Sequence, residues 1–448
     1  MDLKYPDEMI RVGSFFNQNI KRWKQVRNKS MILLTTSRMR RMYDQVIVRC
    51  SANLVKHFAE NIGYNGGQQF AVKAEMARFN FDIFLGTAFS LDSHMGNQSD
   101  PGQYRQYWSM MSAGVRLEAE IIWREMNVRM PWYCQSVANW WTGSDLVKSL
   151  ADVKDLISRY LVQRLENRET IGDKYSTNKS DDIVDVYLKS IDQNVSLSDP
   201  ISIEMMSYYL VVQFLGLFGS INDTLSELVV HLAGYPEVQK KIYKEIAEAL
   251  DDYENSEQLV DDNNPNTGCL DSSLGRLHKL SYDTLIHLPY MDAAIKEFFR
   301  TNSFVRLSRV FVGGGGGNTS DTEAGKCIPG IQLRPNDRID VQISAIHMSD
   351  ELFDQPAVYN PDRFLDPANQ AKWSQLDANS LLNFGLGPQM CVGSRLAMLV
   401  IKSLLAHMIY NYELCLPQSG DPYRPKRPEL PDIPNRFYHL KCCIKSRK

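Results

Sequence analysis

Cys391 is the residue whose surroundings point most directly to chemistry. It lies in the stretch FGLGPQMCVG, residues 384–393, where two glycines and a proline exclude a regular helix or strand before the cysteine. Glycine also lets the backbone approach a flat ligand closely. The residues after Gly393 follow a helical pattern, so Cys391 is expected just before a helix N-terminus, where the partial positive charge favours a thiolate. A loop thiolate of this kind suits an axial ligand to haem iron.

Two short motifs further along the chain combine an acid with arginines. Glu297 and Arg300 are three residues apart, so they share one face of a predicted helix. Arg363 follows in the segment PDRF, residues 361–364. At the surface such residues would form an ordinary ion pair that contributes little to stability. In the interior, breaking the group would cost on the order of 3–5 kcal/mol.

Two earlier stretches also carry candidate functional residues. Trp23 and Arg27 are four residues apart, hence on one helix face; alone they would be read as a surface aromatic–cation pair. Ser220 lies in an apolar stretch that predicts a buried helix of over 30 residues, beginning near Pro200 and ending near Ala233. Its hydroxyl could hold a bound molecule and relay protons, or the small residues there could simply permit close helix packing.

Taken together, these motifs resemble those of the cytochrome P450 superfamily, the haem-thiolate monooxygenases. Phe384, Gly387, Cys391 and Gly393 match the haem-binding loop of that family. The resemblance implies that heme b is the cofactor and that Cys391 is its axial ligand. It also implies that Glu297, Arg300 and Arg363 form a buried network that holds the haem loop. The nearest pattern is that of animal microsomal members.

The same resemblance assigns roles to several other residues. Trp23, Arg27 and Arg309 are expected to hold the haem propionates. Gln389 stands where the family usually has Arg or His, so it offers a hydrogen bond but no charge.

The helix that carries Ser220 matches the family pattern only in part. Ser220 aligns with the usual threonine of the helix over the haem, whereas Gly219 stands in place of the usual acid. Asp223, one helical turn on, is a candidate to replace that acid through a water molecule. Gly216 falls where a small residue opens space beside the iron.

Composition limits the other possibilities. The chain has 448 residues, of which 44% are hydrophobic, so it can bury a large core. The net charge of −3 implies no nucleic-acid partner. The eight cysteines have no regular spacing, which argues against a disulfide scaffold or a zinc site. A Cys-nucleophile hydrolase is disfavoured because no histidine is positioned by the sequence as its partner.

The pattern of elements predicts a mainly α fold with small β-sheets. Residues 70–90 predict a core helix and residues 339–346 a strand, while residues 310–327 predict a flexible Gly-rich insertion. The fold implied by the resemblance is a single cytochrome P450 domain over residues 1–448. It is expected to lack the N-terminal anchor and the first β and α elements, because the Trp23 motif comes early and no apolar run long enough to span a membrane is present.

The function implied is a monooxygenase that inserts one oxygen atom of dioxygen into a lipophilic substrate. Electrons would come from NADPH through NADPH-cytochrome P450 reductase or another donor. Membrane association at the cytosolic face of the endoplasmic reticulum is expected from the family. The alternative is a degenerate or truncated haem-binding paralogue without activity, which the departures at Gly219 and Gln389 leave open.

Overall fold

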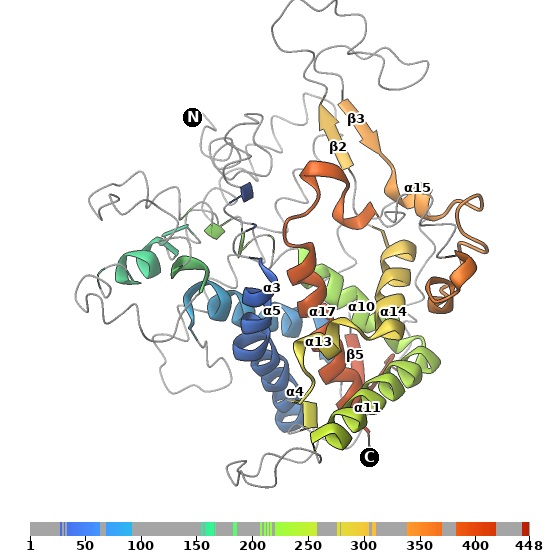
Figure 1. Cartoon of the computed structure of the whole chain (residues 1–448), viewed down its shortest axis with the longest axis horizontal. Coiled ribbons are helices and arrows are strands. Elements are labelled where there is room, and N and C mark those ends of the chain that lie inside the picture. Colours follow the sequence, from blue (N-terminus) through green and yellow to red (C-terminus); the bar gives the residue numbers. More distant parts are fainter. Residues whose placement is uncertain are drawn as a thin grey trace, which may run out of the picture. The chain divides into compact units, whose positions relative to one another are not determined.

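The structure is a computed structural model, mainly helical with two small sheets (Figure 1). The residues that it describes are 27–28, 31, 34–62, 69–91, 154–155, 157–164, 166, 182–185, 207, 210–211, 213–214, 216, 220–257, 276–277, 279–303, 307–310, 338–369, 382–417 and 441–447. The predicted fold class, mainly α with small β-sheets, is confirmed.

The chain divides into two compact units, Met1–Leu288 with Val392–Lys448, and Pro289–Cys391. The elements of the first unit are α3 (Thr36–Met42), the π-helical turn η1 (Tyr43–Ile47), α4 (Val48–Ile62), β1 (Gln69–Ala71), α5 (Val72–Phe89), α10 (Ile221–Ala233), α11 (Pro236–Glu257), α13 (Tyr282–Ile286), α17 (Ser394–Asn411), β4 (Tyr412–Cys415) and β5 (Lys441–Ser446). The assignment of the whole chain to one P450 domain stays a prediction.

Helix α17 is the central helix of the first unit and begins directly after the predicted cysteine loop. Gly393 is its N-cap residue, and the Gly393 carbonyl accepts a hydrogen bond from the Ala397 amide at 2.8 Å. The helix is apolar on most of its faces, so nearly every side chain from Leu396 to Tyr410 is buried. It packs against α4, α11 and α13. The predicted helix after Gly393 is therefore confirmed.

Helix α5 is equally buried and confirms the core helix predicted over residues 70–90. Gly86 lets it approach η1 closely, because a Cβ atom at Gly86 would lie 2.5 Å from Cγ1 of Val46. Helix α5 also packs against α10, and an ion pair joins the Lys73 Nζ to the Asp223 Oδ1 at 2.9 Å.

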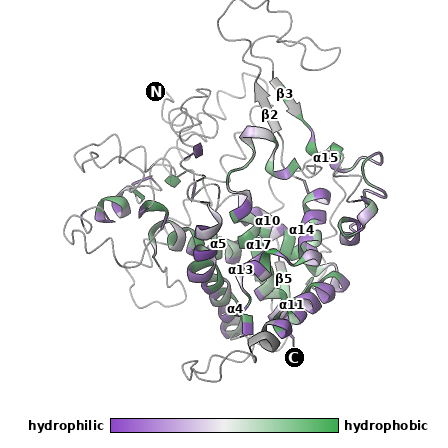
Figure 2. Ribbon diagram, viewed as in Figure 1, coloured by the Kyte–Doolittle hydropathy of each residue, from purple (hydrophilic) through white to green (hydrophobic). Residues whose placement is uncertain are grey.

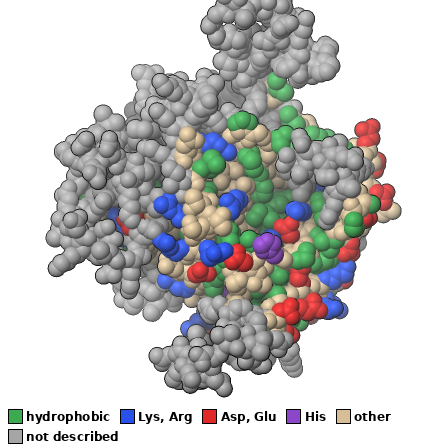
Figure 3. All heavy atoms as spheres, in the orientation of Figure 1, with side chains coloured by type: hydrophobic (Ala, Val, Ile, Leu, Met, Phe, Trp, Pro, Cys, Tyr) green, Lys and Arg blue, Asp and Glu red, His purple; other side chains and the backbone are tan. Residues whose placement is uncertain are grey.

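Helices α4 and α11 lie at the surface and are amphipathic (Figure 2). In α4, Val55 and Phe58 are buried whereas Lys56 is exposed. The outer face of α11 carries charges of both signs (Figure 3), including an exposed pair of Lys244 and Glu248 at 3.5 Å. Such faces are typical of helices that cover a core on one side only.

The sheet of the first unit has the strand order β1-β5-β4, and both pairings are antiparallel. Leu414 lies opposite Ile444, and the alternation of the ladder from the bond between Arg447 and Asn411 directs its backbone groups away from β5. They bond instead to the buried side chain of Gln239 on α11: the Leu414 amide donates to Oε1 at 2.9 Å, and Nε2 donates to the Leu414 carbonyl at 3.0 Å. A side-chain amide thus occupies the place of a neighbouring strand.

The second unit contains α14 (Pro289–Thr301), β2 (Leu307–Val310), β3 (Arg338–Val341), α15 (Ile343–His347) and the 3-10 helices η4 (Pro361–Phe364), η5 (Leu382–Phe384) and η6 (Gly387–Gln389). Strands β2 and β3 pair antiparallel, with Val310 opposite Arg338. Apart from Val310, the Gly-rich insertion predicted over 310–327 lies outside the described residues.

Two predicted elements differ from the structure. The strand predicted over residues 339–346 ends at Val341, and α15 follows. Helix α10 ends at Ala233 as predicted but begins at Ile221, although the residues described between 207 and 214 are also helical. Among the described elements, no helix is both long enough and apolar enough to cross a membrane.

Candidate functional site: a buried charge network behind a cysteine loop

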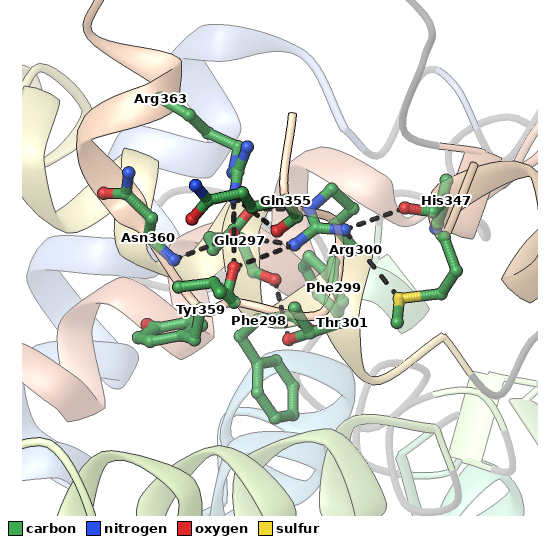
Figure 4. Close-up of polar contacts among 12 residues, drawn as sticks. Glu297, Phe298, Phe299, Arg300, Thr301, His347, Gln355, Tyr359, Asn360 and Arg363 are labelled. Atoms are coloured by element: carbon green, nitrogen blue, oxygen red, sulfur yellow. Dashed lines mark hydrogen bonds and ion pairs between the residues drawn. The ribbon is translucent and has the colours of Figure 1, made fainter. Parts of the chain in front are cut away.

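Glu297 is the centre of a charge network in the second unit (Figure 4). It lies on α14 with an exposed fraction of 0%. Its Oε2 accepts from Arg300 Nε at 2.7 Å, and its Oε1 accepts from Arg300 Nη2 at 2.8 Å. The same Oε1 also accepts from Arg363 Nε at 2.9 Å and from the Asn360 amide at 2.9 Å. The structure thus brings together the three residues that the sequence predicted as a network.

Arg300 uses the remaining donors of its guanidinium on the backbone. Its Nη1 donates to the His347 carbonyl at 2.8 Å, and its Nη2 donates to the Val358 carbonyl at 3.3 Å. The guanidinium also lies over the ring of Phe353, 5.0 Å from its centroid. Because the side chain is fully buried, these contacts replace the water that a charged group would otherwise require.

Arg363 comes from η4 and fixes the segment just before it. Its Nη1 donates to the Asp354 carbonyl at 2.7 Å, and its Nη2 donates to the Val358 carbonyl at 3.0 Å. Gln355 in this segment has a φ of 46°, a left-handed conformation that a non-glycine residue seldom adopts. The two arginines therefore hold an irregular backbone path through its carbonyl groups.

Two further side chains connect this network to the start of the cysteine loop. The Leu382 amide donates to Nε2 of His347 at 3.2 Å, and His347 is completely buried. Asn383 Nδ2 donates to the Phe299 carbonyl on α14 at 3.0 Å. His347 is the last residue of helix α15, and Asn383 was not identified from the sequence. The available signal for Asn383 was a polar side chain directly before the loop motif.

The loop itself is closed by a short backbone bond. The Cys391 amide donates to the Phe384 carbonyl at 2.7 Å, and the Phe384 ring packs edge-on against Phe299 at 5.5 Å. Gly385 and Gly387 have φ angles of 76° and 73°, a region open to glycine without strain. The predicted irregular loop before Cys391 is therefore present, and it is attached to α14 through Phe384.

This loop fits a flat cofactor of the kind that the resemblance implies. The Cys391 thiol is exposed, and it is not part of a disulfide. Leu386 and Met390 are 52% and 39% exposed, so the loop presents two large apolar side chains and an accessible thiol that a ring could contact. A Cβ atom at Gly387 would meet no atom within 4 Å, so the backbone there is open to an approaching ring.

Of the residues predicted to hold the haem propionates or to lie beside them, the structure describes only some. Trp23 lies outside the described residues, whereas Arg27 is described and half-buried in a short helical stretch. Arg309 lies on β2, opposite Ile339. Gln389 lies in η6, two residues before Cys391.

Ser220 and Asp223 lie at the start of α10 in the first unit. The Ser220 side chain is exposed, and it makes no capping hydrogen bond to the helix. The Asp223 carboxylate is paired with Lys73 on α5. This ion pair counts against the hypothesis that Asp223 replaces the missing acid, since the pair gives the carboxylate a structural partner.

Comparison with known proteins supports the same reading. The sequence matches the family model of Cytochrome P450 over residues 3–440. It is 23% identical to Probable cytochrome P450 9h1 of Drosophila melanogaster, with 91% of this chain and 72% of the relative covered. It is 23% identical to Cytochrome P450 3A16 of Mus musculus, with 87% and 67% covered.

A third relative, Probable cytochrome P450 28c1 of Drosophila melanogaster, is 29% identical over a shorter match. That match covers 51% of this chain and 38% of the length of the relative. The family model extends over far more than half of the chain. This chain belongs to the cytochrome P450 family of haem monooxygenases.

Proposed function

We propose that the protein binds heme b through the Cys391 thiolate and acts as a monooxygenase on a lipophilic substrate. The observation that carries this proposal is the attachment of an exposed thiol to a buried charge network. Cys391 is bonded through its amide to Phe384. The Leu382 amide is bonded to His347, whose carbonyl Arg300 holds, and Asn383 and Phe384 contact Phe299 on the helix that carries Glu297 and Arg300. A ligand on such a support keeps one position, which binding of the haem iron would require.

The bound haem would supply the activation of dioxygen for insertion of one oxygen atom into the substrate. Cys391 would supply a negatively charged sulfur ligand. Gly385 and Gly387 would let the backbone lie close to the ring, since no side chain projects from either. Trp23, Arg27 and Arg309 are proposed to pair with its carboxylates, and Gln389 would contribute a neutral hydrogen bond at the same rim.

Ser220 is proposed to hold and pass a proton with its hydroxyl group. Its exposed side chain leaves the hydroxyl available to a ligand or to water. Because Gly219 has no side chain and Asp223 is paired with Lys73, the second proton carrier is proposed to be water.

The partners are proposed from the family. The electron donor would be NADPH-cytochrome P450 reductase or an equivalent protein, and the location would be the cytosolic face of the endoplasmic reticulum membrane. Co-fractionation of the protein with microsomes, together with reduction of its haem by NADPH only when the reductase is added, would test both points.

The main experiment is the carbon-monoxide difference spectrum of the dithionite-reduced protein. The wild type is expected to give the red-shifted Soret band of thiolate-ligated haem, and Cys391→Ser is expected to lose it. Cys415→Ser is the matched control, because it removes a thiol from β4 and leaves the loop intact.

Three outcomes are distinguishable in this experiment. A wild-type band that survives Cys391→Ser would contradict the ligand assignment. Bound haem with the expected band but no substrate oxidation in the presence of a working reductase would favour the alternative, a haem-binding paralogue without activity. Folded protein that takes up no haem would contradict both readings.

A further inference from the structure

Two cysteines lie directly opposite each other in the sheet of the first unit. Cys415 is the last residue of β4, and its partner in the antiparallel register is Cys443 on β5. Opposed residues in an antiparallel pair project from the same face of the sheet. Neither cysteine is part of a disulfide.

The hydrogen-bond pattern gives the spacing of this pair. The Arg447 amide donates to the Asn411 carbonyl at 2.9 Å, so these two residues form a hydrogen-bonded pair. They lie next to the first pair of the register, Tyr412 opposite Ser446. Hydrogen-bonded and non-bonded pairs alternate along an antiparallel ladder, and Cys415 and Cys443 are four steps on from Asn411 and Arg447. They are therefore also a hydrogen-bonded pair, with a Cα separation of about 5.5 Å, within the range that disulfides span. Their Cβ atoms are expected about 5 Å apart, so the strands must move together by about 1 Å for the bond to form.

The third cysteine of the sheet, Cys442, projects from the opposite face. It is completely buried, and its thiol contacts the carbonyl groups of Cys415 and Cys443 at 3.4 and 3.3 Å. Because alternate residues of a strand face opposite sides, the Cys442 sulfur is not placed to meet the Cys415 sulfur. The geometry selects one pair out of three thiols.

The surroundings of Cys415 and Cys443 favour the protonated form of both thiols. Burial raises the pKa of the Cys415 thiol, although the neighbouring charge of Lys445 opposes the shift. Burial also raises the pKa of the Cys443 thiol, and negative charge on Cys415 adds to that effect, as expected for neighbouring sulfurs. Cys415 is half-buried, so a small oxidant can reach it.

We propose that Cys415 and Cys443 form a dithiol modification site that a hydroperoxide converts into a cross-strand disulfide. The Cys415 thiolate attacks the O–O bond, which gives a sulfenic acid and releases an alcohol, or water when the oxidant is hydrogen peroxide. The Cys443 sulfur then attacks the sulfenic sulfur and expels water. The two thiols lose two electrons and two protons in total, and the peroxide accepts them.

The disulfide would join the end of β4 to the C-terminal strand. Asn411 ends α17 and Tyr412 begins β4, so the central helix continues into the linked strand without a turn. Oxidation at this site would therefore cross-link the strand that directly follows α17, the central helix of the first unit. A thiol reductant would reopen the bond.

The test is oxidation of the 448-residue protein with hydrogen peroxide, followed by alkylation, proteolysis and mass spectrometry. The expected product is a peptide pair linked through Cys415 and Cys443 that disappears after reduction. It should form about ten-fold faster in the native protein than in urea, where only the chain between the cysteines brings them together. The reaction should also accelerate with rising pH, because thiolate formation limits it.

Variants provide the controls. Cys442→Ser should retain the linked peptide, whereas Cys415→Ser and Cys443→Ser should each abolish it. A link through Cys442, equal rates in native and unfolded protein, or oxidation of other cysteines with no Cys415–Cys443 link would each overturn the proposal. The measurement on the wild type stands even if one serine variant folds poorly.

Discussion

Arg300 shows, at the scale of single residues, why an arginine is required in the network. Its planar group donates to both oxygens of Glu297 and to two backbone carbonyls in different directions. A lysine has three donors at one point and cannot meet acceptors arranged in this way. Arg300→Lys keeps the charge but is expected to leave buried carbonyls without donors, and should be nearly as damaging as removal of the side chain.

Neutralising Glu297 is the most direct test of the network. In Glu297→Gln the two buried arginines lose their negative partner, so the free energy of unfolding should fall by about 3–5 kcal/mol. Urea unfolding followed by circular dichroism measures this change. The control is Glu248→Gln, which breaks an exposed pair with Lys244 and should cost no more than about 0.5 kcal/mol. Equal effects in the two variants would show that the network does not stabilise the fold.

His347 is expected to position the cysteine loop through the Leu382 amide. His347→Ala removes the acceptor of that amide, so hydrogen exchange should accelerate at Leu382 and at Cys391, whose amide bond to Phe384 depends on the same segment. Exchange mass spectrometry of the peptide over residues 382–391 measures the change. His287→Ala is a control at an exposed helix end. Unchanged exchange over 382–391 would rule out this role.

The sequence predicted the charged members of the site but not the groups that surround them. Glu297, Arg300 and Arg363 were identifiable because their motifs match those of the family that the sequence resembles. Their backbone acceptors, such as the carbonyls of His347 and Val358, were not, since every residue has a carbonyl group and only the tertiary path decides which ones are presented.

At the scale of elements, α5 and α15 show when periodicity is decisive. Residues 72–89 are apolar over five turns, and no strand of that length is common, so the helix was predictable. Residues 339–346 are too short for such a test. Ile343 and His347 are the buried residues of α15. They are four residues apart, and this spacing places two residues on the same face of a strand as well as on the same face of a helix.

The approach of α5 to η1 depends on Gly86. In Gly86→Ala the new methyl group would lie 2.5 Å from Val46 Cγ1, so a buried side chain or the helix must shift. We expect a loss of about 1–3 kcal/mol in the free energy of unfolding, measured by urea titration. Val46→Ala in the same chain should recover part of this loss, since it removes the clashing atom. If the double variant is as unstable as the sum of the single variants, the clash is not the cause.

At the scale of the whole molecule, the buried His231 makes stability depend on pH. Burial lowers its pKa from 6.5 to about 4, so the unfolded chain binds a proton that the folded chain does not between these values. The contribution of neutral His231 to the free energy of unfolding is therefore fully present above the unfolded pKa of 6.5, and it is lost as the pH falls toward about 4. His231 should reduce the free energy of unfolding by about 2 kcal/mol from about pH 7 to about pH 5. In His231→Phe, which keeps a ring beside Tyr235, this dependence should disappear from urea unfolding curves.

Asp182 should act in the opposite direction. Burial, with the neighbouring Asp185 charge, raises its pKa from 3.8 to about 6, although Arg164 opposes the shift. The folded chain therefore holds the additional proton, and stability falls as pH rises through about 6. Asp182→Asn should steepen the loss of stability on acidification by about 1 kcal/mol between about pH 7 and pH 5. An unchanged pH profile in this variant would show that the carboxyl group titrates normally in the folded state.

The side-chain amide of Gln239 has a consequence beyond folding. Among the strands that the structure describes, β4 is the last of its sheet. One side of it would otherwise present an unsatisfied amide and carbonyl at Leu414, and such an edge invites pairing with a strand of another molecule. Gln239 occupies both groups. Because the Gln239 side chain cannot continue the ladder, it blocks the pairing of another strand at Leu414, the kind of edge-to-edge contact through which sheets aggregate.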